Sequence, residues 1–366
     1  MKIENTNLNI PTISVGSAVS SLCELYTNAI MSNISFKALP TPFLWGPAGV
    51  GKSDGVKELS KLLSGNTGKN VVVTDIRLLL FSPVDLRGVP VADEHRQFTN
   101  WLKPGIFAMD DSPDTVNLLF LDELSAAPQS VQAAAYQICL DRKVGEHVLP
   151  DNCIVIAAGN RTTDQSVSYK MPKALCNRLM HFNITSDFEA WKEWAMNNDI
   201  DSRIIGYLSF DRTKLCIEPD TSDMAYPTPR SWSFVSNLLK ASGKEPGDIH
   251  SLICACIGTG IAVEFEAWCK VFEGLPKIDG IMSGTCNRYP CSHDELYALT
   301  SGLTSAVREK GADISMAVLE NCCRYVKRFP ADFAMTFYKD IMGDKNIKLK
   351  LMKCPSMQEW LAKTNT

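Results

Sequence analysis

The sequence has no long apolar run and no leader-like start. Although 45% of its 366 residues are hydrophobic, no stretch approaches the roughly 20 consecutive apolar residues that cross a bilayer as a helix. The first residues, MKIENTNLNIPTIS, lack the basic and apolar blocks of a secretory signal. We find no internal repeat and no low-complexity tail. We therefore expect a globular protein of the cytoplasm, with one large domain or two moderate ones.

Clusters of basic residues are also missing. The 37 lysines and arginines are outnumbered by 41 acidic residues, which gives a net charge of -4 and an isoelectric point near 5.8. A sequence-independent nucleic-acid binder usually gathers its basic residues, whereas here they are scattered among acids. Nucleic acid is therefore not the expected partner, although a basic channel that forms only on assembly stays open.

Cysteines are plentiful, with 13 in the chain. Because the number is odd and nothing suggests export, we interpret them as reduced thiols. Cys286, Cys291 and His293 have part of the spacing of a metal site, but a fourth ligand and a repeat of the pattern are missing, so we favour a structural role. Cys322 and Cys323 lie in a helical pattern and are expected to pack as small apolar side chains.

The first half of the chain has the pattern of an α/β fold. Residues 17–31 carry apolar side chains at helical spacing and predict an amphipathic helix. Several short apolar runs follow without alternation, separated by helical stretches, as in a parallel sheet that is covered on both faces. The runs are PFLW (42–45), NVVVTDI (70–76), NLLFLDE (117–123), CIVIAAGN (153–160) and HFNI (181–184).

The pattern changes after residue 185. Helical periodicity then dominates, as in RSWSFVSNLLKAS and ISMAVLENCCRYVKR, and few strand signals interrupt it. We therefore predict an α/β domain over residues 1–185 and a mostly α-helical domain over residues 186–366.

The segment GPAGVGKS fits the phosphate-loop pattern G-x-x-x-x-G-K-[ST], follows an apolar strand and opens a helix. Its glycines let backbone N–H groups turn towards phosphate oxygens, and the helix dipole adds to the attraction. Lys52 is expected to reach the β- and γ-phosphates of ATP, and the Ser53 hydroxyl to bind Mg²⁺. The predicted nucleotide-binding residues of this loop are Gly46, Pro47, Ala48, Gly49, Val50, Gly51, Lys52 and Ser53.

Two acids follow at the end of a later apolar run, in LLFLDELS. Asp122 is expected to hold Mg²⁺ with Ser53, and Glu123 to act as the general base on the attacking water. Adjacent acids at a buried strand end would be costly without a metal ion. Taken alone, this motif is only weak evidence for an ATPase. It becomes strong evidence because it follows about 70 residues after the phosphate loop.

Three more polar residues complete the set. Asn160 ends the next strand, where a neutral amide can bind both the γ-phosphate and the water. Arg178 precedes the last strand and, taken alone, would be an ordinary surface arginine. Arg230, in YPTPRSWSFVSNLL, stands at a helix start, where the dipole disfavours a cation unless an anion lies opposite.

In this order the motifs resemble those of AAA+ ATPases, and more narrowly those of the MoxR group. The matching segments, spread over nearly the whole chain, are FLWGPAGVGKS, SPVDLRGVP, LLFLDELSAAP, DRKVGEHVLPDNCIVIAAGNR, MPKALCNRLMHF and YPTPRSWSFV. The resemblance implies a P-loop core followed by an α-helical lid, with ATP and Mg²⁺ as ligands. By this resemblance Asn160 is the sensor-1 residue, Arg178 the arginine finger and Arg230 the sensor-2 arginine, in cis or in trans.

The resemblance also implies two hairpins. One is expected in DRKVGEHVLPDN, before the strand at residue 153, and another as an insert in residues 84–112. In the second, Phe98 and Trp101 could touch a substrate in a central pore or could simply pack.

Members of this family form rings, usually of six, so each site would be shared between two chains. A remodelling chaperone for a protein client, such as a protein with a von Willebrand factor A domain, is the favoured function. A nucleic-acid motor is the alternative, because minichromosome-maintenance helicases share the hairpin class. A nucleotide-gated scaffold is a third, which the intact Glu123, Asn160 and Arg178 oppose. If Arg178 is not the finger, Arg142 or Arg161 would be next.

Overall fold

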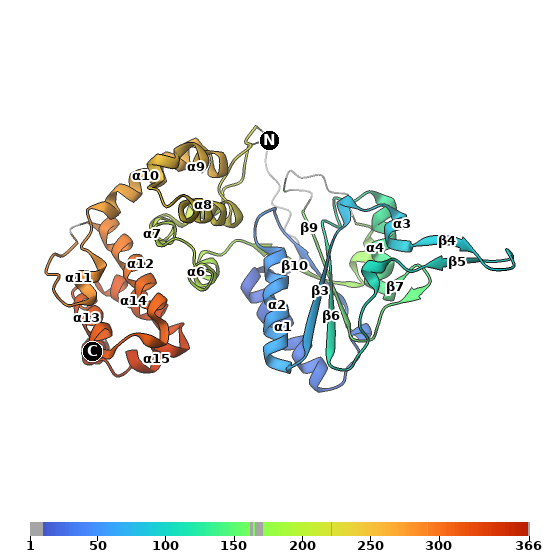
Figure 1. Cartoon of the computed structure of the whole chain (residues 1–366), viewed down its shortest axis with the longest axis horizontal. Helices are drawn as coiled ribbons and strands as arrows, with labels where there is room; N and C mark the ends of the chain where they lie inside the picture. The colour runs from blue at the N-terminus through green and yellow to red at the C-terminus, as the bar shows by residue number, and fades with distance from the viewer. Residues whose placement is uncertain (1–9, 162–163, 165–170, 221, 291, 365–366) are drawn as a thin grey trace. The chain divides into compact units, whose positions relative to one another are not determined.

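The chain folds into two compact units, Met1–Asp187 and Phe188–Thr366 (Figure 1). The computed structural model describes residues 10–161, 164, 171–220, 222–290 and 292–364, so the N-terminal residues 1–9 and Cys291 lie outside it. The assignment of the first unit to nucleotide binding and of the second to a lid stays a prediction.

The first unit is built on a six-stranded parallel sheet. Its strand order is β1-β10-β2-β9-β6-β3. The strands are β1 (Thr12–Ser14), β2 (Thr41–Trp45), β3 (Asn70–Arg77), β6 (Thr115–Asp122), β9 (Cys153–Gly159) and β10 (Leu179–Thr185). Every residue of β6 and β9 is buried, which is why these central strands are continuous apolar runs in the sequence. Each of the five predicted runs contributes a strand, and β1 is an additional short edge strand.

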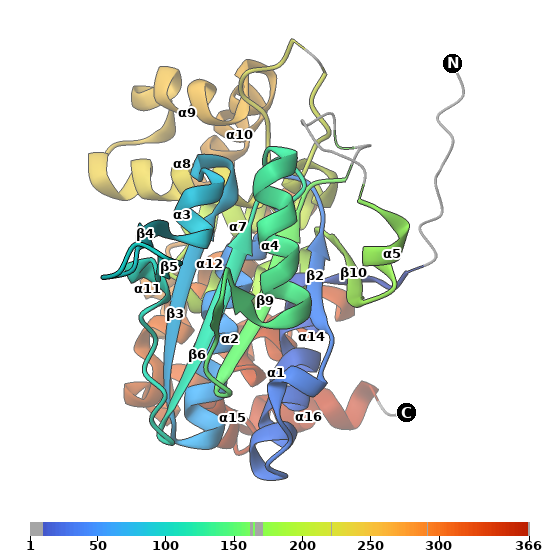
Figure 2. The same cartoon turned by 90° about the vertical axis from the view of Figure 1, so that its right-hand side faces the viewer.

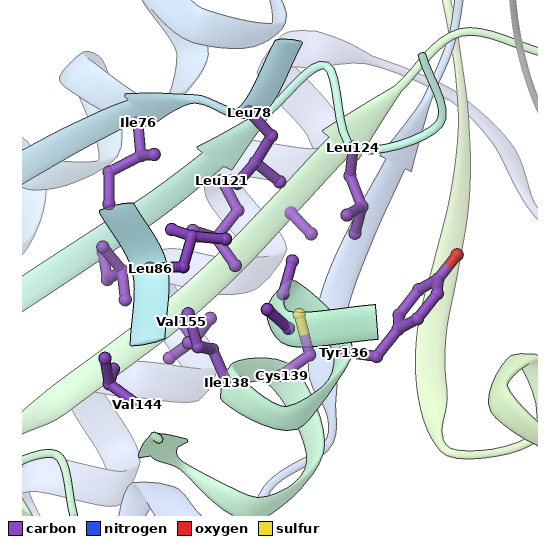
Figure 3. Close-up of a cluster of buried hydrophobic side chains, with 14 of the residues drawn as sticks. Ile76, Leu78, Leu86, Leu121, Leu124, Tyr136, Ile138, Cys139, Val144 and Val155 are labelled. Carbon is purple, nitrogen blue, oxygen red and sulfur yellow. The ribbon is translucent and has the colours of Figure 1, made fainter. Parts of the chain in front are cut away.

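Helices cover both faces of this sheet, α1 (Val15–Met31) and α2 (Lys52–Thr67) on one face, and α3 (Pro83–Arg87) and α4 (Gln129–Asp141) on the other (Figure 2). Successive residues of β6 point to opposite faces. Leu118 and Phe120 pack in the core with α1 and α2. Leu119 and Leu121 pack with α3 and α4 (Figure 3). The predicted α/β fold, with a parallel sheet covered on both faces, is confirmed.

Two small hairpins project from this core. The first hairpin consists of the antiparallel strands β4 (Val89–Ala92) and β5 (Thr99–Leu102), which pair along all four residues of each strand. It lies within residues 84–112, where an inserted hairpin is expected. The second hairpin lies between α4 and β9 and consists of β7 (Lys143–Val144) and β8 (His147–Val148). Its turn contains Gly145, which has a φ of 58°. A Cβ on Gly145 would lie 2.8 Å from the Arg87 carbonyl oxygen, so the turn requires glycine.

The second unit is helical in every described element, as predicted. Its helices are α6 (Phe188–Asn197), α7 (Ser202–Phe210), α8 (Pro229–Ser242), α9 (His250–Ile257), α10 (Thr259–Glu273), α11 (Ile278–Met282), α12 (His293–Lys310), α13 (Met316–Val326), α14 (Ala331–Met342), α15 (Lys345–Leu351) and α16 (Pro355–Thr364). One core lies around Trp232 and Phe265, and another around Leu303 and Phe337.

The remaining elements are short. They are the helix α5 (Lys173–Cys176) and the 3₁₀ helices Phe36–Ala38, Leu78–Leu80, Gly105–Phe107, Arg212–Leu215, Pro246–Ile249 and Gly311–Asp313. Within the described residues, no helix combines the length and the apolar character that a membrane crossing requires.

Candidate nucleotide site

The phosphate-loop segment connects β2 to α2. Gly49 and Gly51 have φ values of 78° and 98°, which is the left-handed region where glycine has no steric cost. A Cβ on Gly46 would lie 2.6 Å from the Ile184 carbonyl oxygen, so the loop also needs glycine where it passes β10. Lys52 is the first residue of α2, and the loop therefore lies at the positive end of a helix dipole.

Lys52 is at the centre of the site and is only 8% exposed. Its Nζ donates hydrogen bonds to the carbonyl oxygens of Gly46, at 2.5 Å, and Pro47, at 2.9 Å. It also donates to Asn160 Oδ1 at 3.2 Å. The ammonium group therefore joins the loop after β2 to the amide at the end of β9, two segments that are 108 residues apart in the chain.

Ser53 and Asp122 form the second contact of the site. The Ser53 Oγ donates to Asp122 Oδ2 at 2.9 Å, and the backbone N–H of Glu123 donates to Asp122 Oδ1 at 2.8 Å. Asp122 is the last residue of β6 and is 9% exposed. A hydroxyl and a carboxylate are oxygen donors of the kind that Mg²⁺ takes together with phosphate oxygens, so this pair fits the predicted ion.

Glu123 has an unusual backbone. Its φ is 58°, in the left-handed region that residues other than glycine rarely adopt. The N–H groups of Ala126 and Ala127 both donate to its carbonyl oxygen, at 3.1 and 3.2 Å, and its side chain is half-buried. The tight turn that follows β6 therefore fixes the backbone of the residue predicted to be the base.

Three consecutive carbonyl groups at the end of β9 hold the site together. The carbonyl oxygen of Ala158 accepts from Leu124 N at 2.9 Å, and that of Gly159 accepts from Gly46 N at 3.2 Å. The carbonyl oxygen of Asn160 accepts from Ser125 Oγ at 2.9 Å. The end of β9 thus binds both the phosphate loop and the turn after β6.

Sequence reasoning missed two residues here. Ser125 lies so close to β9 that a Cβ on Gly159 would be 2.6 Å from its Oγ. Asp75, on β3, is two residues before Arg77, which is the register partner of Asp122. Asp75 is exposed on β3, but partial burial of its carboxyl group raises the pKa above the ordinary value. The negative charge of Asp122 raises this pKa further, and Arg77 and Lys57 partly oppose the shift. Beside Asp122 and Glu123, a third carboxylate therefore lies near the site, and the apolar run NVVVTDI concealed it.

Arg178 lies between α5 and β10, and its side chain is exposed. Within the described part of the chain, its guanidinium group makes no hydrogen bond or ion pair with another side chain. Its role as a finger stays a prediction.

The two alternative fingers are tied into the fold. Arg142 is 4% exposed, and its guanidinium donates to Thr41 Oγ1 and to the carbonyl oxygens of Cys139 and Leu39. Arg161 pairs with Asp164, at 2.8 Å between Nη2 and Oδ1. Arg142 therefore has a structural role and cannot reach a neighbouring chain, so that fallback prediction is wrong on grounds of burial.

Arg230 is the second residue of α8 and is exposed. The helix start is capped without it, because Thr228 Oγ1 accepts from Ser231 N at 3.1 Å and Ser231 Oγ accepts from Thr228 N at 2.7 Å. The first turn has no acidic residue to pair with Arg230. Its contact with a nucleotide stays a prediction.

The cysteine cluster has a structural environment where it is described. The ring of His293 packs edge-on against Phe333, with centroids 6.0 Å apart, and Cys286 Sγ makes a long contact of 3.9 Å with the Arg288 carbonyl oxygen. Cys291 lies outside the described residues. Among the residues that are described, no three His, Cys, Asp or Glu side chains gather as they would around a metal ion. Cys322 and Cys323 are both fully buried in a hydrophobic core, as predicted.

Comparisons with known proteins give similar solved structures only. No protein-family model and no curated protein matches the sequence. A RuvB variant from Thermotoga maritima is 15% identical, with 94% of this chain and 87% of that chain covered and a TM-score of 0.36. NtrX from Brucella abortus in complex with ATP is 12% identical, with 100% and 70% covered and a TM-score of 0.34. A chain of the HORMA–CdnC–Trip13 complex from E. coli MS115-1 is 11% identical, with 70% and 88% covered and a TM-score of 0.37. At these values the likenesses carry no argument about the activity of this chain, and the candidate site rests on its own geometry.

Proposed function

We propose that this chain binds ATP with Mg²⁺ and hydrolyses it, as an AAA+ ATPase of the MoxR group. The observation that carries the proposal is the cluster of Lys52, Ser53, Asp122 and Asn160, which hydrogen-bond in pairs at the carboxyl ends of β2, β6 and β9. Ligands of open α/β sheets bind outside the carboxyl ends of the strands.

Each residue of the cluster has a chemical role in this proposal. Lys52 places a positive charge beside the loop carbonyls, where phosphate oxygens would be its alternative partners. Ser53 and Asp122 would hold Mg²⁺, which when bound neutralises phosphate charge. Asn160 adds a hydrogen-bonding group without adding charge, and it is held to the loop by Lys52.

Glu123 would take the proton of the attacking water. Its backbone is fixed by the turn after β6, and that turn is bonded to the end of β9 through Leu124 N. The base and the Asn160 amide are thus held in one hydrogen-bonded frame. Preorganisation of this kind favours a reaction that needs a base and a polar group at fixed positions.

Assembly into a ring, which the resemblance implies to be a hexamer, would complete the site. Arg178 is exposed and is not paired within the described residues, so its charge is available to the γ-phosphate on a neighbouring chain. A finger supplied in this way is worth about 10³ to 10⁵ in rate. Arg230 would add a second charge from the helical unit, in cis or in trans.

A protein client is the proposed partner, and a protein with a von Willebrand factor A domain is the specific candidate. The hairpin of β4 and β5 supports a contact surface, because it exposes apolar side chains that would otherwise be costly in water. These include Phe98, which is 72% exposed, Leu102, at 59%, and Val89, at 53%. The described cysteines are all free thiols, which supports a reducing compartment such as the cytoplasm.

Paired variants test the nucleotide chemistry. Lys52→Ala removes a charged hydrogen-bond donor and should weaken ATP binding by roughly 10- to 100-fold. Glu123→Gln should keep ATP and lose about 10² to 10⁴ in turnover. Lys57→Ala, on an exposed face of the same helix, should change neither. Equilibrium binding and phosphate release would be measured for all three.

Two outcomes would change the proposal. Normal hydrolysis by Glu123→Gln would remove Glu123 as the base, and unchanged ATP binding by Lys52→Ala would remove the phosphate loop. DNA should stimulate turnover little at about 0.15 M salt. A large stimulation that disappears at higher salt would favour the nucleic-acid motor.

A further inference from the structure

A cysteine, a histidine and a glutamate contact one another in a row on two neighbouring helices of the second unit. The Cys254 sulfur, one helical turn further along α9, lies 3.2 Å from His250 Nε2 and 3.8 Å from His250 Nδ1, so it is placed over the imidazole ring and nearer to Nε2. His250 Nδ1 lies 2.6 Å from Glu266 Oε1, on α10. None of the three has a role in the ATP chemistry proposed above.

The contact with Glu266 favours one tautomer of a neutral His250 ring. An ionised carboxylate only accepts hydrogen bonds, so Nδ1 of His250 must donate its N–H to Glu266. In the neutral imidazole the other nitrogen, Nε2, is then the one that can take up a proton, and it is the ring nitrogen nearer to the Cys254 sulfur. A nucleophile, a base that contacts it and a third group that orients the base are the arrangement of an activated nucleophile.

Access separates Cys254 from the buried thiols of the described chain. Its side chain is partly exposed, and the neighbouring His250 side chain is 41% exposed. Cys256 is two residues away on the same helix and is also partly exposed. Burial raises the pKa of Cys256, and within the described chain no imidazole contacts it. Cys256 is therefore a built-in reference for a thiol without a base.

We propose that Cys254 is a reactive thiol that forms a mixed disulfide with a low-molecular-weight disulfide, with His250 as its base and Glu266 as a positioning residue. The Cys254 sulfur attacks one sulfur of the small disulfide, a new S–S bond forms and the old one breaks. The thiol proton passes to His250 Nε2 and then to the leaving thiolate, so one small thiol is released. Exchange of this kind requires an attacking thiolate and access. His250 is the base that would take the thiol proton, and Cys254 is partly exposed.

The test uses the full-length, reduced protein and oxidised glutathione as the probe. Fragmentation mass spectrometry would follow glutathione addition at Cys254 and at Cys256 over time. We expect Cys254 to react about 100-fold faster or more, which is the lower end of what a positioned base contributes. His250→Gln should slow Cys254 to the rate of Cys256 and leave Cys256 unchanged.

A matched pair of variants on α10 separates positioning from general damage. Glu266→Gln should slow Cys254. Glu264→Gln should not, because the Glu264 carboxylate bonds Tyr207 and Lys214 instead of His250. Circular dichroism would show that each variant folds.

Either of two results would overturn the proposal. One is equal reactivity of Cys254 and Cys256 in the unaltered protein, which decides the question even if a variant does not fold. The other is a folded His250→Gln protein in which Cys254 keeps its rate. Both results are independent of whether the chain hydrolyses ATP.

Discussion

The left-handed backbone of Glu123 leads to a prediction with an unusual sign. A residue with a Cβ in this region costs about 1–2 kcal/mol, and glycine avoids that cost. Glycine also gains freedom in the unfolded chain, which destabilises a protein by about 0.5–1 kcal/mol. Glu123→Gly should therefore be as stable as Glu123→Gln or more stable, by up to about 1.5 kcal/mol. Both variants should lose about 10² to 10⁴ in ATP turnover.

A neighbouring position provides the control. Ala126 lies in the same turn and is not among the residues with positive φ, so Ala126→Gly should lose about 0.5–1 kcal/mol. The stability of the first unit would be measured by hydrogen exchange of β6 amides over a series of urea concentrations. If Glu123→Gly were less stable than Glu123→Gln by the same amount as the control, Glu123 would not carry the strain inferred from its φ of 58°.

Two further predictions concern charge. Arg178→Ala should bind ATP nearly normally and lose about 10³-fold or more in the rate of hydrolysis. Mixing it with Lys52→Ala chains should restore partial activity. If native mass spectrometry shows that mixed rings form and activity still does not recover, a finger in trans is excluded. The raised pKa of Asp75 means that folding favours its protonated form, so that stability is lost as the pH rises through the folded-state pKa. Asp75→Asn should therefore raise the free energy of unfolding of the first unit at pH 7, and this gain should disappear as the pH falls towards about 4, the ordinary pKa of Asp. Urea unfolding at several pH values would measure the gain, and a larger gain in acid would contradict the prediction.

The buried strands could be predicted because burial on both faces leaves a continuous apolar run. β6 and β9 show this most clearly, since all of their residues are buried. β1 was missed because it has only three residues, none of them buried. In the same way, Asp75 was hidden in a run of β-branched residues that reads as core.

The motif predicted which residues the site contains but not how they contact one another. Nothing in LLFLDELS indicates that Glu123 has a positive φ, because this depends on hydrogen bonds to the turn that follows. Arg142 was a reasonable alternative finger in the sequence, yet only the tertiary fold shows its guanidinium among the carbonyls of Leu39 and Cys139. His250 and Cys254 have a spacing that the sequence shows, but Glu266 joins them from the next helix.

The three carbonyl groups at the end of β9 have a consequence for how this site can evolve. The phosphate loop and the turn after β6 are fixed to Ala158, Gly159 and Asn160 through main-chain acceptors, which every amino acid provides. Side chains along β9 can therefore be exchanged for others of similar volume without disturbing the alignment of the two segments. Gly159 is the exception, because a Cβ there would collide with Ser125. The architecture of the site can thus persist while most of the strand's sequence drifts, with the tightest constraint on a residue that has no side chain.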